Sequence, residues 1–427
     1  MKSFSRRVFI KLASLTALGA ALRWLWPGKS TGQEPEEEWF SFLPQIHKGL
    51  SSISTPTPTS TPTSTPTPTS SPTPTATSMP EIGNRVVHVY SANATNWDYV
   101  SGYFFEHVDQ VQVDHMVDRG VKELTGVATV ASAWRILLSA VTEYTPGKGI
   151  AIKVNLNNAW DNACGDMVNE LDALIEPVNA VIRGLKLMGV QESDIWVFDA
   201  TRPLLDRFVD GCDYTSVQFF NQSGSTCVTP VTWYSADPSA VIAFSGGGLA
   251  DDRVPDLLVE ATYLINMPIL KAHGGAGVTL GFKHHFGSIR RPWDLHPYTY
   301  GYEASFDPSW SPLIDIYANP NILEKTVLTI GDCLFGSWQN NTGSLPKWGT
   351  FKNNLGTDAP NSLFFALDPV AIDSVMSDFV KAENPSRVED WVVNYLSLAE
   401  GEGLGTFEQG NPWGSGYSRI DYRRLIL

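Results

Sequence analysis

The stretch LINMPILKAHGGAGVTLGFKHHFGSIRRP, residues 264–292, predicts both a fold class and the location of a candidate functional site. It begins as an apolar strand, passes through glycines, and then gathers lysines, histidines and arginines within a short span. A strand this apolar is typical of a sheet that is covered on both faces. Because the whole chain has a net charge of −15, a cluster of bases after such a strand indicates a specific partner.

The alternation of strand, turn and helix recurs on both sides of this stretch. Strand-like runs occur at residues 149–156, 194–200, 325–332 and 361–369, and helical spacing at 171–190 and 369–382. This order predicts an α/β fold with a mostly parallel sheet flanked by helices. Residues 81–427 are long enough for one large domain or for two interleaved subdomains.

Several of the predicted strands end in a polar or charged residue. These residues are Asn155, Asp199, Lys271, Asp332 and Asp368. In open α/β sheets, ligands bind in the crevice outside the carboxyl ends of the strands. We therefore expect a shared crevice, although caps of helices and turns would explain each residue singly.

The basic residues of the opening stretch suit an anion. They are Lys271, Lys283, Arg290 and Arg291. The glycines do not have the spacing of a phosphate-binding loop, so they serve tight turns near a ligand instead. In an extended chain Lys271 and His273 share one side, and the glycines let Lys283 return toward them. We expect Asn155 and Asp368 in the same pocket, with the Asp368 carboxylate between the two amines when no ligand is bound.

Four histidines, His273, His284, His285 and His296, fall within 24 residues, which raises a metal site as a hypothesis. The candidate ligands are His273 and His285, because adjacent side chains of a strand point to opposite sides. The alternative to a metal site is that these histidines form hydrogen bonds within the core or a turn. The metal, if any, and the cofactor are left undefined by the sequence.

The four cysteines contain no C-x-x-C pair, so the chain has no iron–sulfur or zinc-ribbon motif. Cys212 and Cys227 enclose a turn-rich segment and are the expected disulfide. Four cysteines allow three full pairings, and the sequence does not choose among them.

The N-terminus reads SRRVFIK at residues 5–11 and continues into a short apolar run, which resembles a twin-arginine export signal. We assign residues 1–30 to this signal or to an uncleaved anchor. Residues 31–80 are an acidic and aromatic segment followed by a disordered Thr/Pro-rich spacer. The expected location is the cell envelope or the exterior, with the export machinery as a partner and membrane contact only through the N-terminal segment.

Composition supports a folded, acidic body. The chain is 43% hydrophobic, which is ample for a core, and has 45 Asp and Glu against 30 Lys and Arg. Nucleic-acid binding by general electrostatics is therefore excluded.

The opening stretch resembles the signature of the family called domain of unknown function 362. There an apolar strand ends in Pro and is followed by Lys-x-His, a Thr, and Lys-Asn-x-x-Gly. The matching residues here are Pro268, Lys271, His273, Thr279, Lys283 and Gly287. The chain departs from the pattern at His284, where the family commonly has Asn.

Further segments within residues 84–405 look like the same family. They contain Lys153, Asn155, Asp332, Asp368 and Asp373. The family has no generally established activity, so the resemblance implies a fold and a candidate site rather than a reaction. It places these five residues around a ligand or cofactor, with Asp332 and Asp373 orienting the bases.

These observations lead to one functional expectation and one rival. The first is an exported, tethered α/β protein that binds a small anionic ligand or cofactor, with redox or acid/base chemistry if it is an enzyme. Lys271, His273 and Lys283 would then be catalytic. The rival is a non-catalytic cell-envelope protein that binds carbohydrate through some of its 14 tryptophans, or a structural one.

Overall fold

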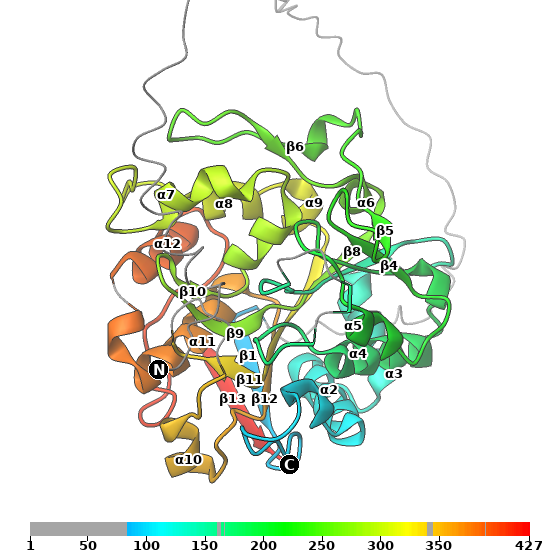
Figure 1. The fold of residues 1–427 in the computed structure, drawn as a ribbon, viewed down its shortest axis with the longest axis vertical. Coiled ribbons are helices and arrows are strands. Elements are labelled where there is room, and N and C mark those ends of the chain that lie inside the picture. The colour runs from blue at the N-terminus through cyan, green and yellow to red at the C-terminus, as the bar shows by residue number, and fades with distance from the viewer. Residues whose placement is uncertain (1–82, 160–163, 166, 340–344, 389) are drawn as a thin grey trace, which may run out of the picture. The chain divides into compact units, whose positions relative to one another are not determined.

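The computed structural model describes residues 83–159, 164–165, 167–339, 345–388 and 390–427 (Figure 1). The predicted signal and spacer lie outside the described residues. The described residues all belong to one compact unit, Ala76–Leu427. Within them, no helix is both long and apolar enough to cross a membrane.

A mixed, mostly parallel sheet of eleven strands forms the centre of the fold, in the order β13-β1-β12-β11-β8-β2-β3-β4-β5, with β9 beside β11 and β10 beside β9. The strands are β1 (Arg85–Tyr90), β2 (Ile150–Lys153), β3 (Ile195–Phe198), β4 (Gln218–Asn221), β5 (Thr229–Pro230), β8 (Tyr263–Asn266), β9 (Ile269–His273), β10 (Gly277–Thr279), β11 (Thr326–Ser337), β12 (Ser362–Ala366) and β13 (Asp421–Ile426). A separate pair joins β6 (Val241–Ile242) to β7 (Asp252–Arg253).

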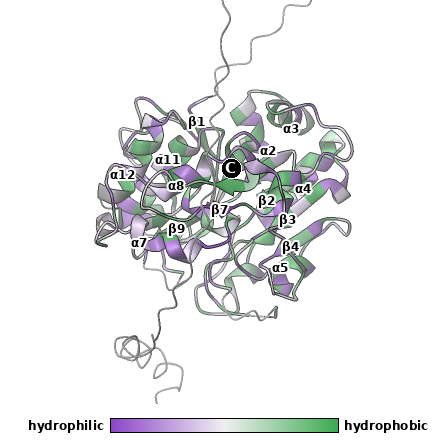
Figure 2. Ribbon diagram, turned by 90° about the horizontal axis from the view of Figure 1, so that it is seen from above, coloured by the Kyte–Doolittle hydropathy of each residue, from purple (hydrophilic) through white to green (hydrophobic). Residues whose placement is uncertain are grey.

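Two layers of helices cover the sheet, and Figure 2 shows the strands between them. The α-helices are α2 (Gln110–Thr125), α3 (Val130–Ser139), α4 (Ile175–Met188), α5 (Asp206–Asp210), α6 (Asp256–Glu260), α7 (His296–Thr299), α8 (Pro312–Tyr317), α9 (Pro320–Leu323), α10 (Gly349–Leu355), α11 (Pro369–Glu383) and α12 (Asp390–Gly401). Short 3-10 helices include η4 (Lys283–Ser288) and η5 (Pro292–Leu295).

Successive residues along the strands point alternately into the two hydrophobic cores. Ile150 and Ile152 of β2 pack with α2, α3 and α4, whereas Ala151 packs on the side of α8, α11 and α12. This period of two follows from the pleat of a strand. It requires apolar residues on both faces, which is why these strands read as continuous apolar runs. The predicted α/β fold with a mostly parallel, helix-flanked sheet is confirmed.

The strand order reverses between β2 and β8. From β2 the chain moves outward through β3, β4 and β5, and it then returns to β8 on the other side of β2 and continues to β11. Lys153 and Asn266 form the last register pair of β2 and β8. Such a reversal leaves a crevice at the carboxyl ends of the two strands, because the connections leave on opposite faces of the sheet.

The predicted Cys212–Cys227 disulfide is wrong. Cys227 is bonded to Cys164, and Cys212 is a free, half-buried thiol. The reason is topological. Cys212 precedes β4 and Cys227 follows it, so the strand separates them, whereas Cys164 follows β2 and lies at the same edge of the parallel sheet as Cys227.

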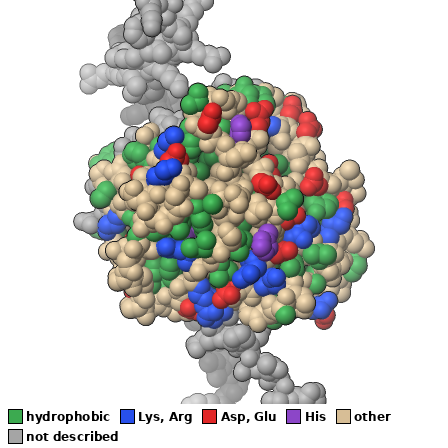
Figure 3. Space-filling view, turned by 90° about the horizontal axis from the view of Figure 1, so that it is seen from below, with side chains coloured by type: hydrophobic (Ala, Val, Ile, Leu, Met, Phe, Trp, Pro, Cys, Tyr) green, Lys and Arg blue, Asp and Glu red, His purple; other side chains and the backbone are tan. Residues whose placement is uncertain are grey.

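The surface of the described body mixes charges. The face shown in Figure 3 scatters Lys, Arg, Asp and Glu side chains among neutral ones.

Candidate functional site

A cavity of about 370 Å³ opens at the carboxyl ends of β2 and β3. This volume lies within the range of small-molecule pockets. Its walls come from the segments that follow β2 and β3, from the β9–β10 hairpin, and from η4 to α7. Lining residues include Asn155, Asp199, Arg202, His273, Thr279, Lys283, His284, Trp293, His296 and Tyr300.

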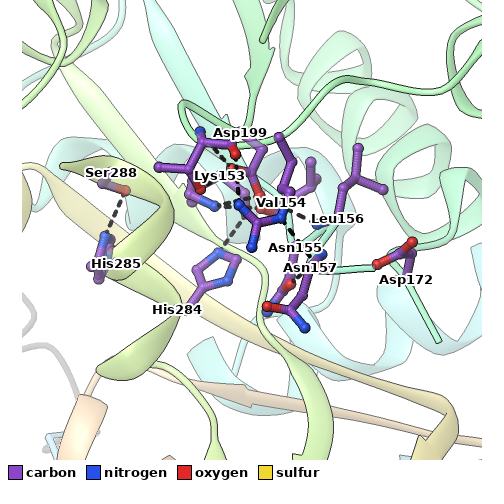
Figure 4. A network of polar contacts seen from close by, with 12 residues as sticks. Lys153, Val154, Asn155, Leu156, Asn157, Asp172, Asp199, His284, His285 and Ser288 are labelled. Atoms are coloured by element: carbon purple, nitrogen blue, oxygen red, sulfur yellow. Dashed lines mark hydrogen bonds and ion pairs between the residues drawn. The ribbon is translucent and has the colours of Figure 1, made fainter. Parts of the chain in front are cut away.

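A buried ion pair ties together the ends of β2 and β3. The Nζ atom of Lys153 lies 3.2 Å from Oδ2 of Asp199, and both side chains are almost fully buried (Figure 4). The other Asp199 oxygen accepts hydrogen bonds from the backbone and the hydroxyl of Thr201. Burial lowers the pKa of Lys153, and the Asp199 carboxylate opposes that shift. The two side chains therefore form a structural ion pair beneath the cavity.

Gly287 allows η4 to pack against this ion pair. A Cβ atom at this position would lie 2.5 Å from Nζ of Lys153 and 3.0 Å from Oδ1 of Asp199. The Gly287 carbonyl accepts a hydrogen bond of 2.9 Å from the backbone N–H of Ala200. Glycine is needed here because any side chain would occupy the space of the lysine amine.

Asp373 holds the chain that leads into η4. From the first turns of α11, its carboxylate accepts hydrogen bonds of 2.7 Å from the N–H of Gly281 and 3.1 Å from that of Phe282. Burial raises the pKa of Asp373 to about 7, and these N–H donors oppose the shift. Asp373 thus positions Lys283 through the backbone rather than through side-chain contact.

Lys283 is buried, and no acidic side chain of the described residues contacts it. Its Nζ lies 3.5 Å from Nε2 of His296 and 4.0 Å from the centre of the Phe286 ring. Burial, followed by the charges of Lys271 and Arg202, lowers the pKa of Lys283 to about 7.

Lys271 lies on the same face of the β9–β10 hairpin as the cavity wall. It is paired directly with Thr279, which lines the cavity, and opposite residues of an antiparallel pair share a face. Its Nζ is buried and makes no hydrogen bond within the described part of the chain. Burial lowers the pKa of Lys271 to about 8, although the nearby Asp172 carboxylate opposes the shift.

His273 is held as a neutral imidazole. Its Nδ1 accepts hydrogen bonds from the N–H groups of Gly275 and Ala276, so its proton lies on Nε2. Burial, and then the charges of Lys283 and Lys271, hold the pKa of His273 well below its usual range. The structure therefore brings Asn155, His273 and Lys283 to one cavity, with Lys271 beside them.

Arg202 and Trp293 were not predicted from the sequence as parts of the site. The Arg202 guanidinium carbon lies 5.1 Å from the centre of the Trp293 ring, and its NH1 donates to the carbonyl of Thr201. The signal was present, because Arg202 follows Asp199 at the end of β3. The pattern of polar strand ends does not include it, because Arg202 lies beyond Asp199 in the segment after β3.

The two adjacent histidines lie in η4 rather than in a strand. His284 lines the cavity and hydrogen bonds through Nε2 with the carbonyl of Lys153 at 3.1 Å, whereas His285 hydrogen bonds with Ser288 at 3.1 Å (Figure 4). The ring of His285 also packs against Tyr317. His285 does not line the cavity that His273 lines, so the predicted metal pair is not formed. No cluster of three or more His, Cys, Asp or Glu suited to a metal ion occurs in the described segments.

The predicted position of Asp368 between the two amines is wrong. Its carboxylate caps α11 by accepting from the N–H groups of Val370 and Ala371, and it also accepts from Thr406. The cause is strand order and direction. The antiparallel strand β12 ends at Ala366, level with the end of β8 but separated from it by β11, and Asp368 beyond it begins α11.

Asp332 also lies away from the cavity wall. It is inside β11, which continues to Ser337, and its carboxylate accepts from the N–H of Leu334. Burial raises the pKa of Asp332 to about 7. Asp332 therefore contacts its own strand, in the part of β11 that pairs with β9.

A comparison with protein-family models matches residues 150–378 to the family described as domain of unknown function (DUF362). The chain belongs to the DUF362 family. The matched region runs from β2 to α11 and contains every residue of the cavity wall, so the sequence resemblance is confirmed over this part of the chain. No curated protein matches the chain.

The packing of η4 on the ion pair predicts the effect of Gly287→Ala. The added methyl group overlaps the Lys153 amine, so we expect the free energy of unfolding, measured with urea, to fall by about 1–3 kcal/mol. Gly401→Ala is the control, because a Cβ at that exposed position meets nothing within 4 Å. Equal stability of the two variants would contradict the role given to Gly287.

Proposed function

We propose that this DUF362 protein binds a small molecule that carries a carboxylate or phosphate group, and that Lys283 and Lys271 hold that group. The observation that supports this most strongly is the absence of any ion pair to either lysine among the described residues. The chain has 45 acidic residues against 30 basic ones, yet no carboxylate of the described residues lies at ion-pair distance from Lys283, and Asp172 and Glu170 act on Lys271 only from beyond that distance.

The energetics favour an anion as the ligand. A buried charge without a partner is costly, and this cost lowers the pKa values of Lys283 and Lys271 to about 7 and about 8. An anion in the cavity supplies the missing countercharge and raises both pKa values again. Binding is therefore coupled to proton uptake when the pH lies above these values.

Acid/base catalysis is the chemistry that these groups support best. An amine with a pKa near 7 is partly neutral at physiological pH and can take up a proton or release one. The Nε2 hydrogen of His273 is a donor on the same cavity. We assign Lys283 and Lys271 together the countercharge to the acid group of the ligand, and Lys283 the uptake of a proton as that group binds and its release as the group leaves.

We test binding with the full chain by calorimetry, using glycolate and sulfate, whose charges are constant between pH 6 and 9. We expect affinity to be greatest near pH 6 and to fall by up to about tenfold per pH unit for each amine that must be protonated. Lys283→Met should weaken binding at pH 6.5 at least tenfold, because it removes one of the two cations that hold the anion.

The matched control is Lys347→Met, which changes an exposed lysine paired with Asp358. It should bind both anions as the natural protein does. An affinity that is independent of pH, or a Lys283→Met variant that binds normally, would refute the proposed anion site.

We also propose export through the twin-arginine machinery, with residues 31–80 tethering the body at the cell envelope. Two observations support it, the SRRVFIK segment at residues 5–11 and the disulfide between Cys164 and Cys227. Disulfides persist mainly in oxidising compartments outside the cytoplasm.

Replacement of Arg6 and Arg7 by lysine should keep the protein in the cytoplasm, since the paired guanidinium groups are the recognised feature of such signals. Cell fractionation measures the outcome. Lys11→Arg is the control and should leave export unchanged. Normal export of the double variant would exclude this route.

A further inference from the structure

A second cavity, of about 550 Å³, adjoins the first. Thr201, Pro292 and Trp293 line both cavities, so the two share one wall. The second cavity therefore provides room past Trp293 for a ligand that is longer than the acid group on Lys283.

Two guanidinium groups line the second cavity without a carboxylate at ion-pair distance among the described residues, although the charge of Arg253 reaches Asp256 from farther away. Arg253 and Arg290 both line it, and neither forms an ion pair with any residue that the structure describes. One NH group of Arg253 donates to the carbonyl of Ser235 at 2.6 Å, while its Nε is buried without a hydrogen-bond partner in the described part of the protein. Arg290 is exposed. Two guanidinium groups that line the same cavity favour an anionic ligand, since guanidinium binds carboxylate or phosphate with two parallel hydrogen bonds.

The neighbouring Arg291, in contrast, does not line the cavity and is engaged with the backbone. Its guanidinium group donates to the backbone carbonyls of Ala250 and Asp251, and its backbone N–H donates to Asp252. Arg291 is thus used in holding the loop, whereas its neighbour Arg290 faces the cavity.

Aromatic rings lie between the two groups of cations. Trp293 is 54% exposed although its ring is beside Arg202 and His296 of the first cavity, and Tyr234 on the wall of the second cavity is 86% exposed. Large exposed rings beside polar groups provide flat surfaces for stacking. They are suited to a ring-shaped portion of a ligand rather than to a flexible chain.

We propose that the second cavity is a subsite for the far end of an elongated dianion that has a ring between its two acid groups. One acid group binds Lys283 and Lys271, the ring packs on Trp293, and the other acid group binds Arg290 and Arg253. This inference rests on the proposed anion site. The shared chemistry fits acidic sugars and aromatic diacids alike.

The experiment compares matched anions on the full chain by calorimetry at pH 6.5. The sugar pair is digalacturonate against galacturonate, and the aromatic pair is biphenyl-4,4′-dicarboxylate against biphenyl-4-carboxylate. In at least one pair the dianion should bind at least tenfold more tightly than the monoanion, and that pair identifies the class of ligand. Arg290→Gln should remove this advantage and leave the monoanion affinity unchanged.

Arg135→Gln, at an exposed position of α3, is the control and should keep the advantage. Lys283→Met should weaken monoanion and dianion alike. If monoanions bind but neither dianion gains, or if Arg290→Gln keeps the gain, the subsite is refuted and the anion site stands. If no anion binds to the natural protein, the proposed function itself fails.

Discussion

The site depends on the buried ion pair between Lys153 and Asp199, at the point where the strand order reverses. It joins the ends of two neighbouring strands at 3.2 Å and provides the surface on which η4 packs. That packing requires Gly287, and Asp373 fixes the other end of the same segment through two backbone N–H groups. Lys283 therefore reaches the cavity from a short helix that is held at both ends.

The contrast between the three buried lysines explains what the cavity is suited to bind. Lys153 has its carboxylate, and the ion pair is structural. Lys271 and Lys283 have none within ion-pair distance in the described chain, and burial lowers their pKa values toward neutrality. Histidines nearby are neutral for the same reason. This set supports the proposed anion site, and Arg253 and Arg290 beyond Trp293 support the proposed subsite.

Much of the fold and part of the site followed from sequence, because apolar runs, glycines and strand ends are local signals. The sequence singled out Lys271, His273 and Lys283, and the structure places His273 and Lys283 on one cavity wall with Lys271 beside it. Asp368 was misplaced because the order and direction of β12 in the sheet are non-local properties, and Cys212 was mispaired because β4 separates it from Cys227. The contact between Arg202 and Trp293 could not be predicted from the sequence, because the two residues belong to segments far apart in the chain, one after β3 and one after η4. These segments come into contact only in the folded protein.

The most direct test of this account is the pH dependence of stability. Between pH 8 and 10 the unfolded chain binds a proton at Lys283, with an ordinary pKa near 10.5, which the folded protein does not bind because its pKa is about 7. The free energy of unfolding should therefore rise with pH, and Lys283→Met should reduce this slope by up to about 1.4 kcal/mol per pH unit. Buried tyrosines and Lys325 contribute equally to both proteins and cancel in the difference. An unchanged slope in the variant would show that Lys283 is charged and paired in the folded protein, contrary to this account.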